Sequence, residues 1–176
     1  MKHLLFFVAI ASFAAVGANA QNKAIKQVKN SSAAMPYQVH YTVVGLGSNA
    51  YTMNVLRAWK DFDNNTLDNL VSLFTDDVVG TFSNGMMVKG KVDFIKAVKD
   101  YRNSLASASS DVDACTAMRS AEHPEMQVVS IWGTETDTHK DGSVTKTHLN
   151  EVWFFNKAGK VYEVHQMSAK EGPDNK

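Results

Sequence analysis

The sequence predicts an α+β fold in which helices in the first half of the chain are covered by a curved, largely antiparallel sheet formed by the second half. The main observation is a pair of consecutive β-hairpins between Met126 and Met167. Asp141-Gly142 suits a two-residue turn with positive φ at both central positions. Residues 156–160 form a longer, Gly-containing turn after the aromatic run 153–155. Long strands that bend back twice after helical segments indicate a sheet with one face covered by helices.

Three helices are predicted before these hairpins. The first begins at Ser48 or Asn49, which can cap it, and its apolar stripe is Met53, Leu56, Trp59 and Phe62. The second begins after Thr66, and its inner face is Leu67, Leu70, Val71 and Phe74. The third follows Gly90, and its inner face is Val92, Ile95, Val98 and Tyr101 or Arg102. The spacing of these apolar residues indicates that each helix buries one side.

Shorter extended segments surround the helices. Residues 37–44 alternate enough for a short strand, and residues 78–82 and 86–88 read as a small hairpin. An extended stretch is expected over 111–119, followed by a loop at 121–125. The expected order is therefore helices interrupted by a small hairpin, then a four-stranded antiparallel run.

The beginning of the chain has the pattern of a secretory signal peptide. Lys2 precedes an apolar run and a small-residue stretch that ends Ala18-Asn19-Ala20. The apolar run is shorter than the ~20 residues that a membrane span needs. We therefore expect cleavage near Ala20-Gln21, a secreted or periplasmic mature protein, and no membrane span. The predicted organisation is a signal peptide over 1–20, a flexible segment over 21–36, one domain over 37–170 and a tail over 171–176.

Composition narrows the choice of partners. The chain has 18 Lys and Arg residues and 18 Asp and Glu residues, so its formal net charge is +0. Scattered, balanced charges argue against a nucleic-acid surface. Cys115 is the only cysteine, so no intramolecular disulfide can form, and we expect it to be a small buried hydrophobic residue. No cofactor is indicated.

Four landmarks in the same order resemble the nuclear-transport-factor-2-like superfamily, which includes ketosteroid isomerases and SnoaL-like polyketide cyclases. They are Ala58-Trp59, the Leu-Phe-Thr-Asp-Asp run at 73–77, Gly90 opening a helix, and the Phe-Asn-Lys-Ala-Gly-Lys-Val turn at 155–161. The resemblance covers roughly residues 49–168. It implies a cystatin-like, cone-shaped sheet wrapped around three helices, with a cavity inside, and it points to no specific member.

Ketosteroid isomerases end their last two strands in a similar turn. Aligned on that turn, the position of their oxyanion-hole Asp falls on Glu151, that of their general base near Phe82, and that of their oxyanion-hole Tyr near Val55. Two of the three catalytic groups are therefore missing, which argues against steroid isomerase chemistry.

Strand alternation then predicts which side chains face the cavity. With Asp141-Gly142 at the centre of the turn, Trp132 lies opposite Glu151 and Thr134 opposite Leu149. The resemblance places this set inward. The predicted lining is Trp59, Phe82, Trp132, Thr134, Glu151, Trp153, Tyr162 and Gln166.

Glu151 is the candidate catalytic residue of this set. Loss of hydration between tryptophans favours its protonated form and suits proton transfer. The alternative is that Glu151 hydrogen-bonds Gln166 or a Thr hydroxyl and orders the sheet. For Trp59 and Trp153, a place in the core is favoured over a role as ligand-stacking surfaces.

The other sheet face is expected to carry an apolar row, made of Val129, Ile131, Val152, Phe154 and Val161. Such a row favours burial in a back-to-back homodimer, as often occurs in the superfamily. In this register Glu135 faces His148 outside, as a surface ion pair. No metal site is expected, because a third ligand near His139 and His148 is missing.

Three functions remain open on the sequence alone. The first is an exported domain that binds a small, partly apolar molecule in the cavity. The second is a lyase-, isomerase- or cyclase-type enzyme that uses Glu151 as acid or base. The third is a non-catalytic dimerisation or protein-interaction module whose cavity is only a core.

Overall fold

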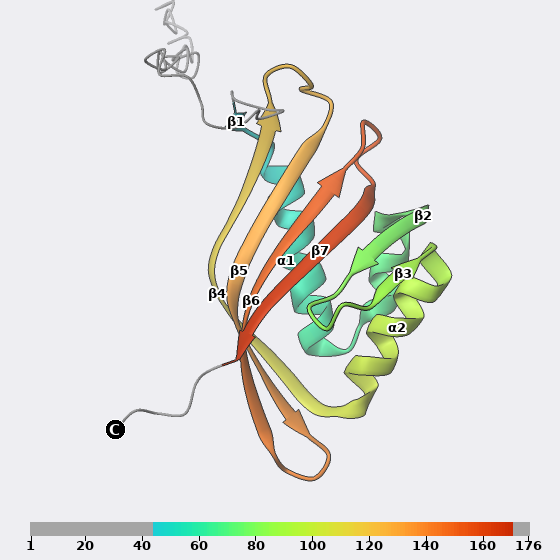
Figure 1. The fold of residues 1–176 in the computed structure, drawn as a ribbon, viewed down its shortest axis with the longest axis vertical. Helices are drawn as coiled ribbons and strands as arrows, with labels where there is room; N and C mark the ends of the chain where they lie inside the picture. The colour runs from blue at the N-terminus through green and yellow to red at the C-terminus, as the bar shows by residue number, and fades with distance from the viewer. Residues whose placement is uncertain (1–43, 171–176) are drawn as a thin grey trace, which may run out of the picture. The chain divides into compact units, whose positions relative to one another are not determined.

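The computed structural model describes residues 44–170. The predictions for the signal peptide, the segment 21–36 and the tail 171–176 lie outside these residues, as does the strand predicted over 37–44 except for Val44. Seven strands form one mixed sheet in the order β1-β4-β5-β6-β7-β2-β3. Neighbouring strands are antiparallel except β2 and β7, which are parallel. The predicted α+β architecture is therefore confirmed (Figure 1).

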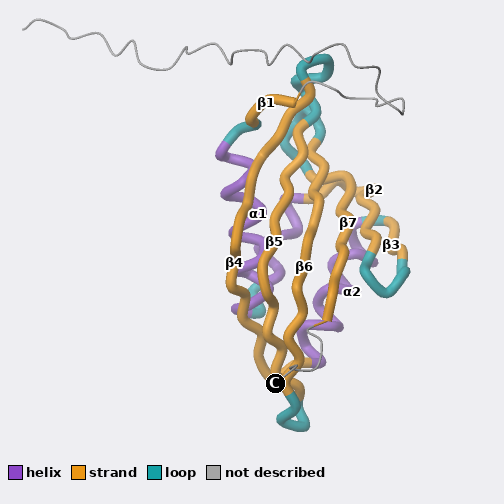
Figure 2. The backbone as a smooth tube through the Cα atoms, turned by 60° about the vertical axis from the view of Figure 1, so that its left-hand side comes forward, coloured by secondary structure: helices purple, strands orange, loops and turns teal. Residues whose placement is uncertain are grey.

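The helices lie on one face of this sheet (Figure 2). They are α1 (Asn49–Asn64), a 3-10 helix η1 (Leu67–Leu73) and α2 (Lys91–Ser104). The strands are β1 (Val44–Leu46), β2 (Phe74–Thr81), β3 (Met87–Lys89), β4 (Leu105–Ser120), β5 (Gln127–His139), β6 (Val144–Phe155) and β7 (Val161–Lys170). The second predicted helix is thus a short 3-10 segment that ends where β2 begins.

Local chemistry explains the ends of α1. The Ser48 hydroxyl accepts a hydrogen bond from the Ala50 N–H at 3.3 Å, which caps the first turn. Asn65 closes the helix with φ 57°, in the left-handed region that Asn tolerates. The buried side of α1 carries Val55, Ala58 and Trp59, so the helix presents an indole ring to the sheet.

The β5–β6 turn differs from the prediction by one residue. The His139 N–H donates to the Ser143 carbonyl at 2.8 Å, and the Gly142 N–H donates to the His139 carbonyl at 3.0 Å. Gly142 alone has positive φ (86°) in this turn. The loop therefore has three residues with Gly in the left-handed position, the bulged alternative to a two-residue turn. Thr138 consequently pairs with Val144.

A slip of one residue moves every side chain of a strand to the other face. Ile131, not Trp132, pairs with Glu151, and Thr134 pairs with His148. The predicted inward placement of Trp132 and Thr134 is therefore wrong, and so is the predicted Glu135–His148 ion pair. Glu135 pairs with Thr147 on the face that the helices cover.

The predicted apolar outer row needs the same correction. Val129, Ile131 and Val161 have 0% exposure and belong to the core between sheet and helices. The outer face carries Val152 and Phe154 as predicted, together with Trp132, which is 39% exposed, and Met167, which is 50% exposed.

Candidate functional site

A cavity of about 470 Å³ lies between the inner face of the sheet and the helices. Its aromatic lining is Trp59, Phe62, Phe74, Phe82, Phe94, Tyr101 and Trp153. Carboxyl, hydroxyl, amide and imidazole groups interrupt this apolar wall at two places, one around Glu151 and one around Glu135. A mostly apolar hollow with a few convergent polar groups is typical of a small-molecule site.

Glu151 is buried on β6, and its carboxyl group accepts hydrogen bonds from three donors. Its Oε2 accepts from the Trp59 indole Nε1–H at 2.7 Å and from the Trp153 Nε1–H at 2.9 Å. Its Oε1 accepts from the Gln166 amide at 3.0 Å. These bonds join α1, β6 and β7, so Glu151 orders the sheet and fixes two rings of the cavity wall. This is the structural alternative considered for Glu151, in a more extensive form.

The second polar group lies nearer the β5–β6 turn. Glu135 lines the cavity, and Asp137 follows it on the same face of β5 with 3% exposure. The Tyr101 hydroxyl donates to Asp137 Oδ2 at 2.6 Å. Asp137 Oδ1 receives no hydrogen bond from any N–H or hydroxyl group of residues 44–170. Its neighbour is the carboxyl group of Glu135.

Burial changes the proton affinity of this group. It raises the pKa of Glu135 to about 8, with further increases from the charges on Asp137 and Glu151 and from the hydrogen bond to Asp137. Burial also raises the pKa of Tyr101, as does its bond to Asp137. Near pH 7 Glu135 is therefore a neutral acid that can donate its proton to Asp137.

Other side chains complete this end of the cavity. Ser110 donates to Asp63 Oδ1 at 2.8 Å, and the His139 ring contacts the Thr145 hydroxyl at 2.9 Å. The nearby Arg102 guanidinium donates to two backbone carbonyls of α1. Acidic groups thus outnumber basic groups around Glu135.

Five of the eight predicted site residues meet at the cavity: Trp59, Phe82, Glu151, Trp153 and Gln166. Trp132, Thr134 and Tyr162 do not line it. The slip at the β5–β6 turn turns Trp132 and Thr134 outward. A bulge between Phe154 and Phe155 in the β6–β7 pairing leaves Tyr162 against the outer Phe154 ring, 6.2 Å between centroids.

The prediction missed Glu135, Asp137 and Tyr101 as members of the site. The alternation Glu135-Thr-Asp137-Thr-His139 does indicate that three ionisable side chains share one face of β5. Only the turn type decides whether that face is the inner one. Gly142 at the third loop position is the signal for the three-residue turn.

Comparison with known proteins shows the fold alone. No protein-family model matches the chain, and no curated protein matches its sequence. Solved structures do match, including a nuclear-transport-factor-2-like protein of unknown function from Exiguobacterium sp. 255-15. It has 17% sequence identity and a TM-score of 0.54, and the match covers 67% of this chain and 99% of that one.

Two further matching structures belong to proteins whose names state a role. An LEH-like epoxide hydrolase of M. tuberculosis matches with a TM-score of 0.57 and 11% identity, over 69% of this chain and 84% of that one. An orange carotenoid protein of Anabaena, solved with canthaxanthin, matches with a TM-score of 0.52 and 16% identity, over 65% of this chain and 35% of that one. The chain thus has the nuclear-transport-factor-2-like, cystatin-like fold that its landmarks suggest.

Two other features concern the described residues only. No helix within 44–170 is both long enough and apolar enough to cross a membrane. Within the same range, no three His, Cys, Asp or Glu side chains converge in a group that could hold a metal ion.

Proposed function

We propose that this protein is an exported domain that binds a small, partly apolar molecule in the cavity between its sheet and helices. The observation that carries the proposal is the 470 Å³ hollow itself, lined by aromatic rings and a few fixed polar groups. Its size lies in the range of roughly 300–1,000 Å³ typical of ligand sites. The orange carotenoid protein, 35% of whose chain matches this fold, was solved with canthaxanthin bound.

Export rests on the first twenty residues, whose charged start, apolar run and Ala-Asn-Ala ending have the pattern of a cleaved leader. Mass spectrometry of the protein recovered from the producing cells tests this part. We expect a mature chain that begins at Gln21.

Two neighbouring positions on β7 allow a matched test of the binding site. Ser168 lines the cavity and is exposed, whereas Ala169 is exposed and pairs with the outward His148. Ser168→Trp should fill the cavity from its edge, and Ala169→Trp adds the same ring to the other face. Both positions are exposed, so both variants should fold.

The experiment is a thermal-shift screen of small apolar and amphipathic molecules against the chain from Gln21. We expect hits to stabilise wild type and Ala169→Trp and to lose at least tenfold in affinity for Ser168→Trp. Hits that bind all three proteins equally would place the ligand elsewhere and contradict the proposal.

The second candidate is an enzyme of the lyase, isomerase or cyclase type, with Glu135 rather than Glu151 as the acid. Glu135 is favoured because its raised pKa, about 8, keeps a proton available inside the cavity at neutral pH. Glu151, by contrast, is held by three donors. Turnover of any screening hit that disappears in Glu135→Gln while binding persists would support this candidate.

We also propose a homodimer formed through the outer face of β5, β6 and β7. The exposed Trp132 and Met167 lie on this face, and their side chains are large and apolar. Light scattering should give twice the mass of the chain for wild type and the mass of one chain for Trp132→Glu. A monomeric wild type would rule the dimer out and leave the cavity unaffected.

A further inference from the structure

We infer that the molecule bound in the cavity carries a cationic ammonium group, which lies against Glu135 and Asp137 while its apolar part lies among the aromatic rings. This inference rests on the proposed ligand-binding function and specifies the chemical class of the ligand. The juxtaposition that carries it is an acidic pair at one end of an aromatic cavity.

The cavity has no cation of its own to balance these acids. Among the described residues, its lining includes Glu135 and Glu151 and contains no Lys or Arg. Arg102 is close by, but its Nε donates to the Phe62 carbonyl at 2.8 Å and its terminal nitrogen donates to the Asp63 carbonyl at 3.0 Å. Among the described residues, no Lys or Arg side chain is therefore hydrogen-bonded to Glu135 or Asp137, and this position is open to a cationic ligand.

Asp137 supplies an independent indication. It is 97% buried, and its Oδ1 has no N–H or hydroxyl partner within residues 44–170. The side chain points to the same face as Glu135 and His139, which line the cavity, and Tyr101 of the lining bonds to its other oxygen. Within residues 44–170, the only donor left for this oxygen is the proton of the neutral Glu135 carboxyl group, and a ligand N–H can replace that proton when the ligand displaces it.

Aromatic rings suit the same ligand. Cations and their attached methylene or methyl groups pack favourably on the faces of Trp, Tyr and Phe rings. Tyr101 links the rings to the acids, because its ring lies in the cavity wall and its hydroxyl binds Asp137. An anionic ligand would meet uncompensated like charges at this end.

Ligand binding should be coupled to a proton. The ionisable and charged groups around Glu135 are Asp63 of α1, Tyr101 and Arg102 of α2, Asp137 and His139 of β5, and Glu151 of β6. Burial and the acidic neighbours keep Glu135 protonated up to about pH 8. An ammonium ion favours the ionised form, so it must displace this proton, and its affinity should increase with pH until Glu135 is ionised.

The test compares three probes that share one ring. They are 1-naphthylmethylamine, 1-naphthylmethanol and 1-naphthoic acid, which are cationic, neutral and anionic at pH 7.5. Calorimetry with the chain from Gln21 should show the amine binding at least tenfold more tightly than the alcohol, and the acid most weakly. In Glu135→Gln the preference for the amine should fall below threefold.

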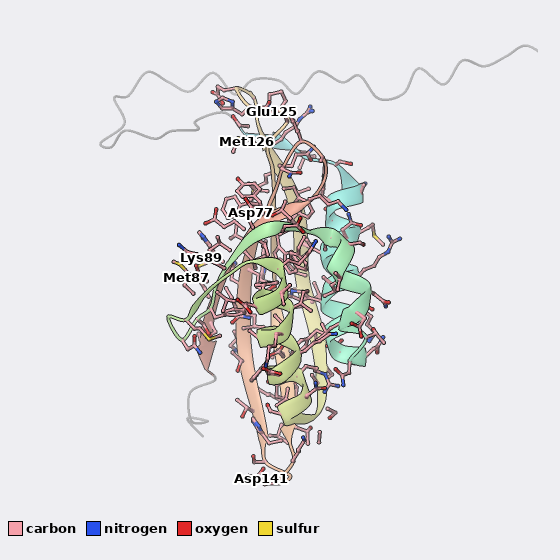
Figure 3. The ribbon with its side chains drawn as sticks, turned by 90° about the vertical axis from the view of Figure 1, so that its right-hand side faces the viewer. Asp77, Met87, Lys89, Glu125, Met126 and Asp141 are labelled. Atoms are coloured by element: carbon pink, nitrogen blue, oxygen red, sulfur yellow. The ribbon has the colours of Figure 1, made fainter. Side chains whose placement is uncertain are left out.

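Glu125→Gln is the matched control, since it removes one carboxylate at an exposed site. Glu125 lies in the β4–β5 loop, at the opposite end of the sheet from Asp141 in the β5–β6 turn (Figure 3). This variant should keep the full preference of wild type for the amine.

A second arm needs only wild-type protein, so it does not depend on how any variant folds. The permanently charged trimethyl(1-naphthylmethyl)ammonium ion should gain at least tenfold in affinity between pH 6 and pH 8. Equal binding of amine and alcohol, tighter binding of the acid, or no binding by any probe would overturn the inference. The Ser168→Trp and Ala169→Trp comparison decides separately whether the cavity binds small molecules at all.

Discussion

Glu135→Gln should stabilise the protein at neutral pH, although it removes an ionisable side chain from the folded core. The reason is proton linkage. The pKa of Glu135 rises from 4.5 to about 8, first because of burial and then because of Asp137 and Glu151. Between these two values the unfolded chain releases a proton that the folded chain retains. The free energy of unfolding of wild type therefore decreases as pH increases through this window.

The magnitude follows from the size of the shift. Each pH unit in the window costs about 1.4 kcal/mol. From pH 4.5 to pH 7 the loss is about 3 kcal/mol, and a Gln side chain, which cannot ionise, avoids it. The Gln amide also keeps an N–H donor for Asp137. The variant should therefore match wild type near pH 4 and exceed it by about 3 kcal/mol at pH 7.

Urea unfolding followed by tryptophan fluorescence, repeated from pH 4 to pH 9, measures this difference. Other carboxylates contribute to the pH dependence of both proteins, so the difference between the two curves isolates Glu135. The exposed control Glu125→Gln should follow wild type at every pH. Parallel curves for wild type and Glu135→Gln, or a variant less stable at pH 7, would show that the pKa of Glu135 is not raised in the folded protein.

Three further changes test separate parts of the structure. Glu151→Ala should lower the free energy of unfolding by about 4 kcal/mol, because two buried indole N–H groups lose their acceptor. Glu151→Gln should lower it by only about 1–2 kcal/mol. Equal decreases in denaturant unfolding would contradict the anchoring role of Glu151. Gly133→Ala should lower the free energy of unfolding by about 3 kcal/mol, because its Cβ would collide with the Asp111 carbonyl oxygen next to the register shift between Val112 and Ala114 in the β4–β5 pairing. An unchanged melting temperature would show that the two strands do not approach so closely at Gly133. Burial raises the pKa of the Cys115 thiol to about 11, so it should react with a disulfide reagent at pH 8 about 100-fold more slowly in native protein than in urea. Equal rates would mean that the thiol is accessible.

The architecture could be predicted because strong local signals agree with one another. Apolar spacing around Trp59 predicted α1, and Gly90 marked the start of α2. The second predicted helix is only a 3-10 segment. Its residues from Phe74 onward pair with β7 instead, since tertiary strand pairing overrides helical spacing.

The site was predicted only in part, because a shift of one residue in strand pairing reverses which side chains of a strand point into the cavity. The residues placed correctly include those on α1, directly after β2, and on β6 between Glu151 and Trp153. Among them, Trp59 and Trp153 both donate to Glu151. Errors followed wherever register was counted through the β5–β6 turn or past the β6–β7 bulge. The alternation along β5 places Glu135 and Asp137 on one face, but neither it nor the resemblance to ketosteroid isomerases contains the information that brings Tyr101 of α2 to them.

The inner position of Glu135 also changes the interpretation of the acidic residues. A carboxyl group that lowers stability at neutral pH, beside an Asp137 oxygen that no N–H or hydroxyl group of residues 44–170 reaches, is poorly explained as scaffold. Glu151, with three donors, is well explained as scaffold. The structure thus separates a supporting acid from an acid that is open to a ligand.

A crystal structure of the chain from Gln21 soaked with 1-naphthylmethylamine tests the central claim most directly. We expect density for the naphthyl ring between Trp59 and Phe82, with the amine nitrogen within hydrogen-bond distance of the Glu135 carboxyl group. Density on the outer face beside Trp132, or an empty cavity in crystals that hold the compound elsewhere, would contradict it.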